Sequence, residues 1–226
     1  MTKNIFIATT EPYSGKSLVS LGIVDMLLGK ARKVGYFKPI INYDPKEKKD
    51  PHIDTILQHF NLPIAYNDAY AFTRRQVMRQ LEGDNRGELI DTIIRKVKAL
   101  EEIYDFTVIE GSDYIGEGAA FEFETNISIA KNLSAPVVVV ISGDNKSTAQ
   151  VINTVQTTLR NFKSREVHVL AAVVNKVKGD QADDVRDLLQ HQFPNGTILA
   201  VIPENKDLQS PTMKEIYERL GGKILF

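Results

Sequence analysis

The feature that most restricts the fold of this chain is the stretch from Ile5 to Leu18, near its start. An apolar run typical of a β-strand leads into a short loop that ends in Gly15, Lys16 and Ser17, and an apolar helical pattern follows at once. This strand–loop–helix order is the one that a phosphate-binding loop requires. Thr10 stands where the usual pattern has its first glycine, so the match is incomplete. The alternative is an ordinary strand–turn–helix with Gly-Lys in the turn.

Each residue type in this loop has a chemical role if phosphate binds there. Backbone N–H groups between Thr10 and Gly15, together with the positive end of the following helix, would meet the phosphate oxygens. Lys16 would reach the outer phosphates, and the hydroxyl of Ser17 could ligate Mg²⁺. Because Pro12 has no N–H and a threonine replaces the flexible glycine, fewer amides are available to phosphate. Tyr13, inside the loop, could cover a bound nucleotide or block the site.

The rest of the chain alternates between strand and helix patterns. Apolar, β-branched runs predict strands over residues 34–38, 106–109, 136–141, 167–174 and 198–202. Helical periodicity predicts helices over residues 16–28, 53–60, 73–81, 86–103, 123–133, 147–162 and 180–191, and residues 64–72 are ambiguous. Such alternation is typical of an α/β fold with a doubly wound, mostly parallel sheet and helices on both faces.

The length of 226 residues suits one sizeable α/β core. We expect a phosphate-binding-loop domain over residues 1–207. Residues 208–226 would then begin a following domain or form a C-terminal tail, because a new helix–turn–strand pattern starts there and stops inside the apolar Ile224–Phe226. A boundary inside a longer protein is therefore predicted, and a final edge strand of the same domain is the alternative.

Composition excludes several function classes. The net charge of −1 and the pI near 6.4 leave no basic footprint for nucleic acid or an anionic membrane. The apolar run at residues 135–141 is too short to cross a bilayer. The chain has no cysteine, which fits a cytoplasmic protein without disulfides. The four histidines show no metal-ligand spacing, so a histidine metal site is not predicted.

Candidate site residues follow the predicted strands, because ligands of open α/β sheets bind at the carboxyl ends of strands. Lys38 ends the second strand and could place positive charge against a phosphoryl group, or could be a surface lysine. Glu110 follows the third strand and could contact Mg²⁺ directly or through water, or could face solvent. Asn175, after a later strand, could hydrogen-bond a purine edge or hold a turn. Asp54, or less favourably Asp50, could complete the metal shell, with helix capping as the alternative.

These segments together resemble a known family. The segments are residues 9–17, 36–40, 108–111 and 173–176, and they are similar to the dethiobiotin synthetase-like P-loop fold. Residues 37–40, 126–133 and 174–177 more closely resemble the N-terminal domain of long phosphotransacetylases (phosphate acetyltransferases). The resemblance covers about residues 4–205, and residues 210–226 look like the opening of the regulatory domain that follows in those proteins.

The resemblance to phosphotransacetylases implies a regulatory and assembly-promoting domain of a homo-oligomer that responds to a nucleotide or small-molecule effector. The parent protein would interconvert acetyl-CoA and acetyl phosphate, with that chemistry in an absent C-terminal domain. Whether this chain is itself an enzyme stays open.

The resemblance to dethiobiotin synthetase implies instead an ATP-dependent ligase that closes a ureido ring. Mg-ATP would then be handled by Lys16, Lys38, Ser17, Asp54 and Glu110, with Asn175 at the adenine. Residues 112–117 depart from the glycine-rich pattern expected after Glu110 in that enzyme. A third hypothesis is a P-loop relic that only mediates oligomer contacts.

Overall fold

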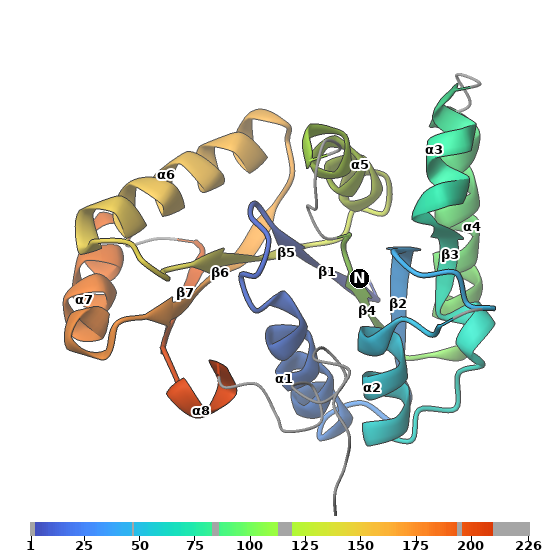
Figure 1. Ribbon diagram of the computed structural model, residues 1–226, viewed down its shortest axis with the longest axis horizontal. Coiled ribbons are helices and arrows are strands. Elements are labelled where there is room, and N and C mark those ends of the chain that lie inside the picture. The colour runs from blue at the N-terminus through green and yellow to red at the C-terminus, as the bar shows by residue number, and fades with distance from the viewer. Residues whose placement is uncertain (1–2, 47, 83–85, 113–118, 194–195, 210–226) are drawn as a thin grey trace, which may run out of the picture.

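A computed structural model describes residues 3–46, 48–82, 86–112, 119–193 and 196–209. Within these residues, seven strands form one sheet in the order β3-β2-β4-β1-β5-β6-β7, and every neighbouring pair is parallel. Helices α5 and α6 lie on one side of the sheet and α1 and α2 on the other (Figure 1). The predicted doubly wound α/β fold with a parallel sheet is confirmed.

The elements alternate along the chain as the sequence pattern predicts. The strands are β1 (Asn4–Thr9), β2 (Val34–Ile41), β3 (Tyr70–Thr73), β4 (Phe106–Glu110), β5 (Val137–Ser142), β6 (Val169–Val177) and β7 (Ile198–Pro203). The α-helices are α1 (Lys16–Leu28), α2 (Pro51–His59), α3 (Arg74–Glu82), α4 (Arg86–Ile103), α5 (Ala119–Asn132), α6 (Thr148–Ser164), α7 (Ala182–Gln192) and α8 (Lys206–Gln209), with 3₁₀ turns at Tyr66–Asp68 and Gly179–Gln181.

Helices α2 and α5 begin two and four residues earlier than predicted, and two other segments differ from the sequence prediction. Strand β2 continues through Pro39 to Ile41, although we expected it to end at Lys38. The missing N–H of Pro39 breaks no ladder, because the pairing of β2 with β4 runs only to Phe37 and the pairing with β3 uses Lys38, Ile40 and Ile41. The ambiguous residues 64–72 contain a 3₁₀ turn and most of the edge strand β3.

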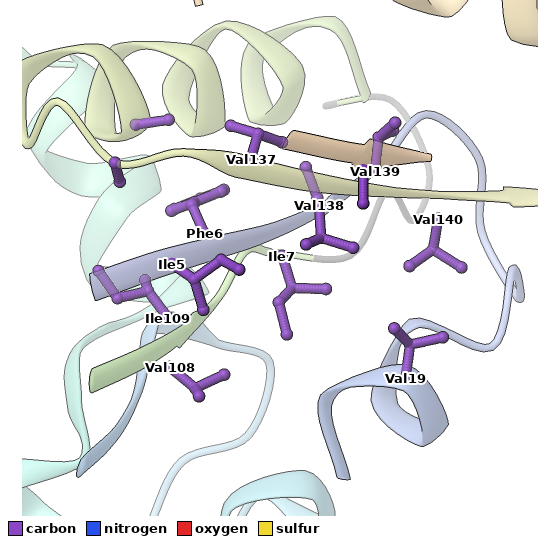
Figure 2. Packing of buried hydrophobic residues seen from close by; sticks show 14 of the residues in the cluster. Ile5, Phe6, Ile7, Val19, Val108, Ile109, Val137, Val138, Val139 and Val140 are labelled. Carbon is purple, nitrogen blue, oxygen red and sulfur yellow. The ribbon is translucent and has the colours of Figure 1, made fainter. Parts of the chain in front are cut away.

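The core is built around β1, whose six residues are all buried. The side chains of Phe6 and Ile7 project to opposite faces of the sheet, and β5 presents a run of buried valines beside them (Figure 2). The side chain of Val19, from α1, points toward these buried residues of β1 and β5 (Figure 2). Both faces of β1 are covered, so the loop that follows β1 begins at a closely packed strand end, at the carboxyl edge of the sheet.

None of the described helices is long and apolar enough to span a membrane. The predicted segment 208–226 lies outside the described residues apart from 208 and 209. Its assignment to a following domain or tail therefore stays a prediction.

Candidate phosphate-binding site

The loop between β1 and α1 has the backbone geometry of an anion-binding turn. Gly15 caps the N-terminus of α1 with φ +84° and ψ 22°, in the left-handed region that favours glycine. A Cβ at this position would lie 2.1 Å from Nδ2 of Asn175, so a side chain is excluded by space as well. Helix α1 therefore begins directly after a glycine, and its first backbone N–H groups lie at the carboxyl edge of the sheet.

Lys16 is the first residue of α1 and is 3% exposed. Its ammonium donates to Oε1 of Glu110 at 2.9 Å and to the carbonyl oxygen of Gly111 at 2.8 Å. The side chain therefore reaches across from α1 to the end of β4. A phosphate that binds the Lys16 ammonium would therefore compete for it with the Glu110 carboxylate.

Glu110, at the end of β4, is fully buried. Burial by itself raises the pKa of its carboxyl, but the charge of Lys16 and the contact with His52 outweigh burial and hold the pKa well below its usual range. The hydroxyl of Tyr36 donates to Oε2 at 3.1 Å, and the Ser17 hydroxyl lies 3.4 Å from Oε1. The carboxylate is the charged centre of the site.

A second buried ion pair comes from β2. The ammonium of Lys38 contacts the carboxylate of Asp50 at 3.2 Å, and both side chains are at most 2% exposed. Asp50 is also the N-cap of α2 and accepts from the backbone N–H groups of His52 and Ile53. Nδ1 of His52 lies 3.1 Å from the Lys38 ammonium, 2.8 Å from Oε1 of Glu110 and 2.9 Å from the Ser17 hydroxyl. His52 thus connects the two ion pairs.

These groups surround a cavity of about 460 Å³ at the carboxyl edge of the sheet. It is large enough for a phosphate-bearing metabolite. Its described lining includes the loop with Gly15 and the lysines Lys16, Lys38 and Lys176. The cavity is therefore lined by three lysines and the N-terminus of a helix, against one carboxylate, that of Asp50, and this balance favours an anion.

The end of β6 holds the loop from the far side. Nδ2 of Asn175 donates to the carbonyl oxygen of Ser14 at 2.9 Å, and the Lys176 ammonium donates to that of Tyr13 at 2.8 Å. The Tyr13 side chain is 83% exposed, and the Glu11 carboxylate turns away to accept from the Ser142 N–H and the Lys146 ammonium, each at 2.8 Å. Neither Tyr13 nor Glu11 fills the space above Lys16.

The structure brings together most of the residues that the sequence singles out. Lys16, Ser17, Lys38 and Glu110 meet within hydrogen-bonded reach, although they come from three elements. Asn175 braces the loop, and Thr10 is half-buried but is not among the described residues that line the cavity.

Asp54 is not brought into the site. It lies one turn into α2, and its carboxylate contacts Lys49 at 3.3 Å at the surface, with 34% of the side chain exposed. Asp50 takes the place beside Lys38, because the N-cap position faces the end of β2. Of the residues expected to ligate Mg²⁺, Ser17 and Glu110 keep their oxygen atoms in the site. Among the described residues, no group of three or more His, Asp or Glu side chains could hold a metal ion.

Sequence reasoning missed two residues of the site. His52 belongs to no recognised motif, and Tyr36 is one of a run of buried strand residues and does not stand out from them. A signal for His52 does exist in Asp50-Pro51, because an aspartate before a proline predicts a helix N-terminus. The histidine one residue later then lies in the first turn, at the same sheet edge as Lys38.

Comparisons with known proteins show what this chain is similar to in sequence. The phosphate acetyltransferase of Nitratidesulfovibrio vulgaris is 37% identical over 230 residues, which cover all of this chain and 33% of that protein. The ATP-dependent dethiobiotin synthetase BioD of Clostridium perfringens is 22% identical over 232 residues, covering 98% of this chain and all of that protein. This chain thus spans about a third of the length of the phosphate acetyltransferase it matches.

Among solved structures, a complex of a Cyanothece McdA variant with ATP has the same fold, with a TM-score of 0.53 at 16% identity. The match covers all of this chain and 98% of that one. The predicted resemblance to the N-terminal part of phosphate acetyltransferases and to dethiobiotin synthetase is confirmed. The family model described as AAA domain matches residues 3–212, and the chain therefore belongs to this family, AAA_26.

Proposed function

We propose that this chain is a nucleotide-binding regulatory domain of a phosphate acetyltransferase. The observation that carries the proposal is the convergence of Lys16 and Lys38 beneath the Gly15 end of α1, in a cavity of about 460 Å³. Two buried ammonium groups at a helix N-terminus form a receptor for a phosphate group. The match to the phosphate acetyltransferase of Nitratidesulfovibrio vulgaris supports the identity of the parent protein.

In this proposal the parent protein converts acetyl-CoA and phosphate into acetyl phosphate and CoA. The acetyl transfer takes place in the part of the relatives that this chain does not match. Ligand binding here acts on that chemistry through Lys16, because a phosphate that takes this ammonium releases Glu110 and Gly111 at the end of β4. The domain also promotes assembly into a homo-oligomer, which analytical ultracentrifugation with and without ATP would measure.

The test is calorimetric titration of the protein with ATP. We expect saturable binding that Lys16→Ala abolishes and that Lys30→Ala leaves unchanged, because Lys30 is an exposed lysine beyond the far end of α1. In the full-length parent protein, acetyl transfer should then change with ATP in the wild type and not in Lys16→Ala. Equal binding by both lysine variants would show that the nucleotide does not use Lys16 and would reject this site. No binding by the wild type would reject nucleotide binding and favour a domain with a purely structural role in assembly.

A ligase of the dethiobiotin synthetase type is the second candidate. The alignment with the Clostridium perfringens dethiobiotin synthetase over its whole length favours it, as does the meeting of Lys16 with Lys38. The surface position of Asp54 speaks against it, since that residue was expected to complete the Mg²⁺ shell. Release of ADP with a diamino acid and CO₂ as substrates tests this function, and turnover no higher than the background would eliminate it.

A further inference from the structure

A second cavity lies beside β3, the outer strand at the opposite edge of the sheet from β7 (Figure 1). Its volume is about 610 Å³, and it is lined by residues of β3, the start of α3, α4 and the loop between β2 and α2. No described residue lines both this cavity and the one at the phosphate-binding loop. The loop after β2 separates them, because Asn42 and Tyr43 line the first cavity and residues 44–46 line the second.

The charged side chains around this second cavity are mostly cationic. Among its described lining residues, a single carboxylate, that of Asp44, stands against four cations. The cations are Lys46, Arg75, Arg79 and Lys96. The whole chain has 28 basic and 29 acidic residues, so the excess is local. Within the part of the chain that the structure describes, none of the four forms an ion pair. Cations around a cavity without carboxylate partners favour an anionic ligand.

Lys96 is the half-buried member of this group. Its ammonium donates to the carbonyl oxygen of Tyr70 at 2.7 Å and to that of Asn67 at 3.1 Å, and it lies 5.7 Å from the centroid of the Tyr70 ring. Two carbonyl oxygens therefore hold the ammonium in place without neutralising its charge. Burial lowers the pKa of Lys96, and the charge of Asp68 acts in the opposite direction. An anion in the cavity would supply further counter-charge.

The two arginines are positioned by the first turn of α3. The Thr73 N–H donates to Oε1 of Gln76 at 2.8 Å, and the Gln76 N–H donates to the Thr73 hydroxyl oxygen at 3.3 Å. This capping box fixes where the helix begins. Arg75 and Arg79 are four residues apart, so they lie on one face of α3, where like charges repel each other and destabilise a helix. An anion shared by the two guanidinium groups would offset this repulsion.

We propose that this cavity is a second anion-binding site, separate from the phosphate-binding loop, for a small metabolite that carries at least two negative charges. The guanidinium groups of Arg75 and Arg79 bind its phosphate or carboxylate oxygens, since a planar fork of N–H donors fits either group. Lys96 contributes a fixed charge from α4, and Lys46 contributes one from the loop after β2. The site does not depend on nucleotide binding at Lys16.

The test is calorimetric titration with two probes, citrate for carboxylates and inorganic pyrophosphate for phosphates. The double variant Arg75→Gln with Arg79→Gln removes both guanidinium groups, and we expect it to bind the preferred probe at least about tenfold more weakly than the wild type. Pyrophosphate can also occupy the first cavity, so for this probe the number of bound equivalents should fall by one. Arg95→Gln with Arg160→Gln is the matched control, because it removes the same charge from two exposed arginines outside the cavity. We expect wild-type binding from it, and thermal unfolding checks that each variant folds.

The possible results also separate this inference from the proposed function. Binding of neither probe by the wild type, or equal weakening in both double variants, would overturn the second site. A variant without Arg75 and Arg79 that binds both probes like the wild type would overturn it as well. The same variant should bind ATP with wild-type affinity, and loss of ATP binding would show that the two cavities form one site. A wild type that does not bind ATP but shows the expected effect with citrate or pyrophosphate would reject the proposed function alone and support this inference.

Discussion

Removing the ammonium of Lys16 tests the central ion pair of the site. Lys16→Met keeps most of the side-chain length but takes from the fully buried Glu110 carboxylate the ammonium that lies 2.9 Å away. Loss of one member of a buried ion pair destabilises by about 3–5 kcal/mol. We expect the lower end, about 3 kcal/mol, because the Tyr36 hydroxyl and His52 still contact the carboxylate. Chemical denaturation followed by circular dichroism measures this change, which corresponds to a Tm lower by about 6–12 °C.

The same variant should change how stability depends on pH. In the wild type the lowered pKa of Glu110 means that the unfolded chain binds a proton at a higher pH than the folded one. The contribution of Glu110 is therefore complete above the unfolded pKa of about 4.3 and is lost as the pH falls through the folded pKa. Without Lys16 the folded pKa rises, so the free energy of unfolding should fall less steeply below about pH 4.3.

The double variant Lys16→Met with Glu110→Gln is the control. A neutral amide needs no counter-ion, so the double variant should be more stable than Lys16→Met alone, with a coupling free energy of about 2 kcal/mol or more. A loss below about 1 kcal/mol in the single variant, or strictly additive effects in the double variant, would refute the reasoning that Lys16 compensates a buried charge.

Two further predictions concern the loop and the start of α2. Gly15→Ala should lower stability by about 1–3 kcal/mol through its φ of +84° and its clash with Asn175, and adding Asn175→Ala should relieve the clash part of that loss in thermal unfolding. An unrelieved double variant would show that φ alone sets the effect. Asp50→Ala should cost about 3 kcal/mol, because it removes an N-cap and the carboxylate paired with Lys38, whereas Asp54→Ala should cost less than about 1 kcal/mol. Equal losses in denaturant would contradict this difference.

The sequence was sufficient for the fold and for the sheet edge at which Lys38 and Glu110 lie. In a parallel sheet the carboxyl ends meet at one edge, so Lys38 and Glu110 could be placed near the Gly15 loop from the order of elements alone. The Gly15-Lys16-Ser17 run, with the apolar helical pattern that follows it, predicted the start of α1. These inferences required only the direction of each strand.

The acidic residue and the histidine at the start of α2 could not be placed in this way, because their positions depend on how the helix is rotated. Whether Asp50 or Asp54 reaches the site depends on where α2 begins, and the predicted start at residue 53 was two residues late. With Pro51 as the first residue, Asp50 becomes the cap and His52 contacts Glu110. Hydrophobic spacing does not reveal such a shift, because the buried Ile53 and Ile56 fit either start.

The bracing of the loop by β6 has a mechanical consequence. Tyr13 and Lys176 both have a positive φ, of 57° and 61°. The Lys176 ammonium donates a hydrogen bond to the Tyr13 carbonyl oxygen, and the Asn175 amide donates one to the carbonyl oxygen of Ser14. A ligand that displaces the loop between β1 and α1 must break these two hydrogen bonds or move the end of β6 together with the loop. Because β6 is paired with β7 up to Val177 and Pro203, a movement of the end of β6 would also displace β7. This strand is the outer strand at the opposite edge of the sheet from β3.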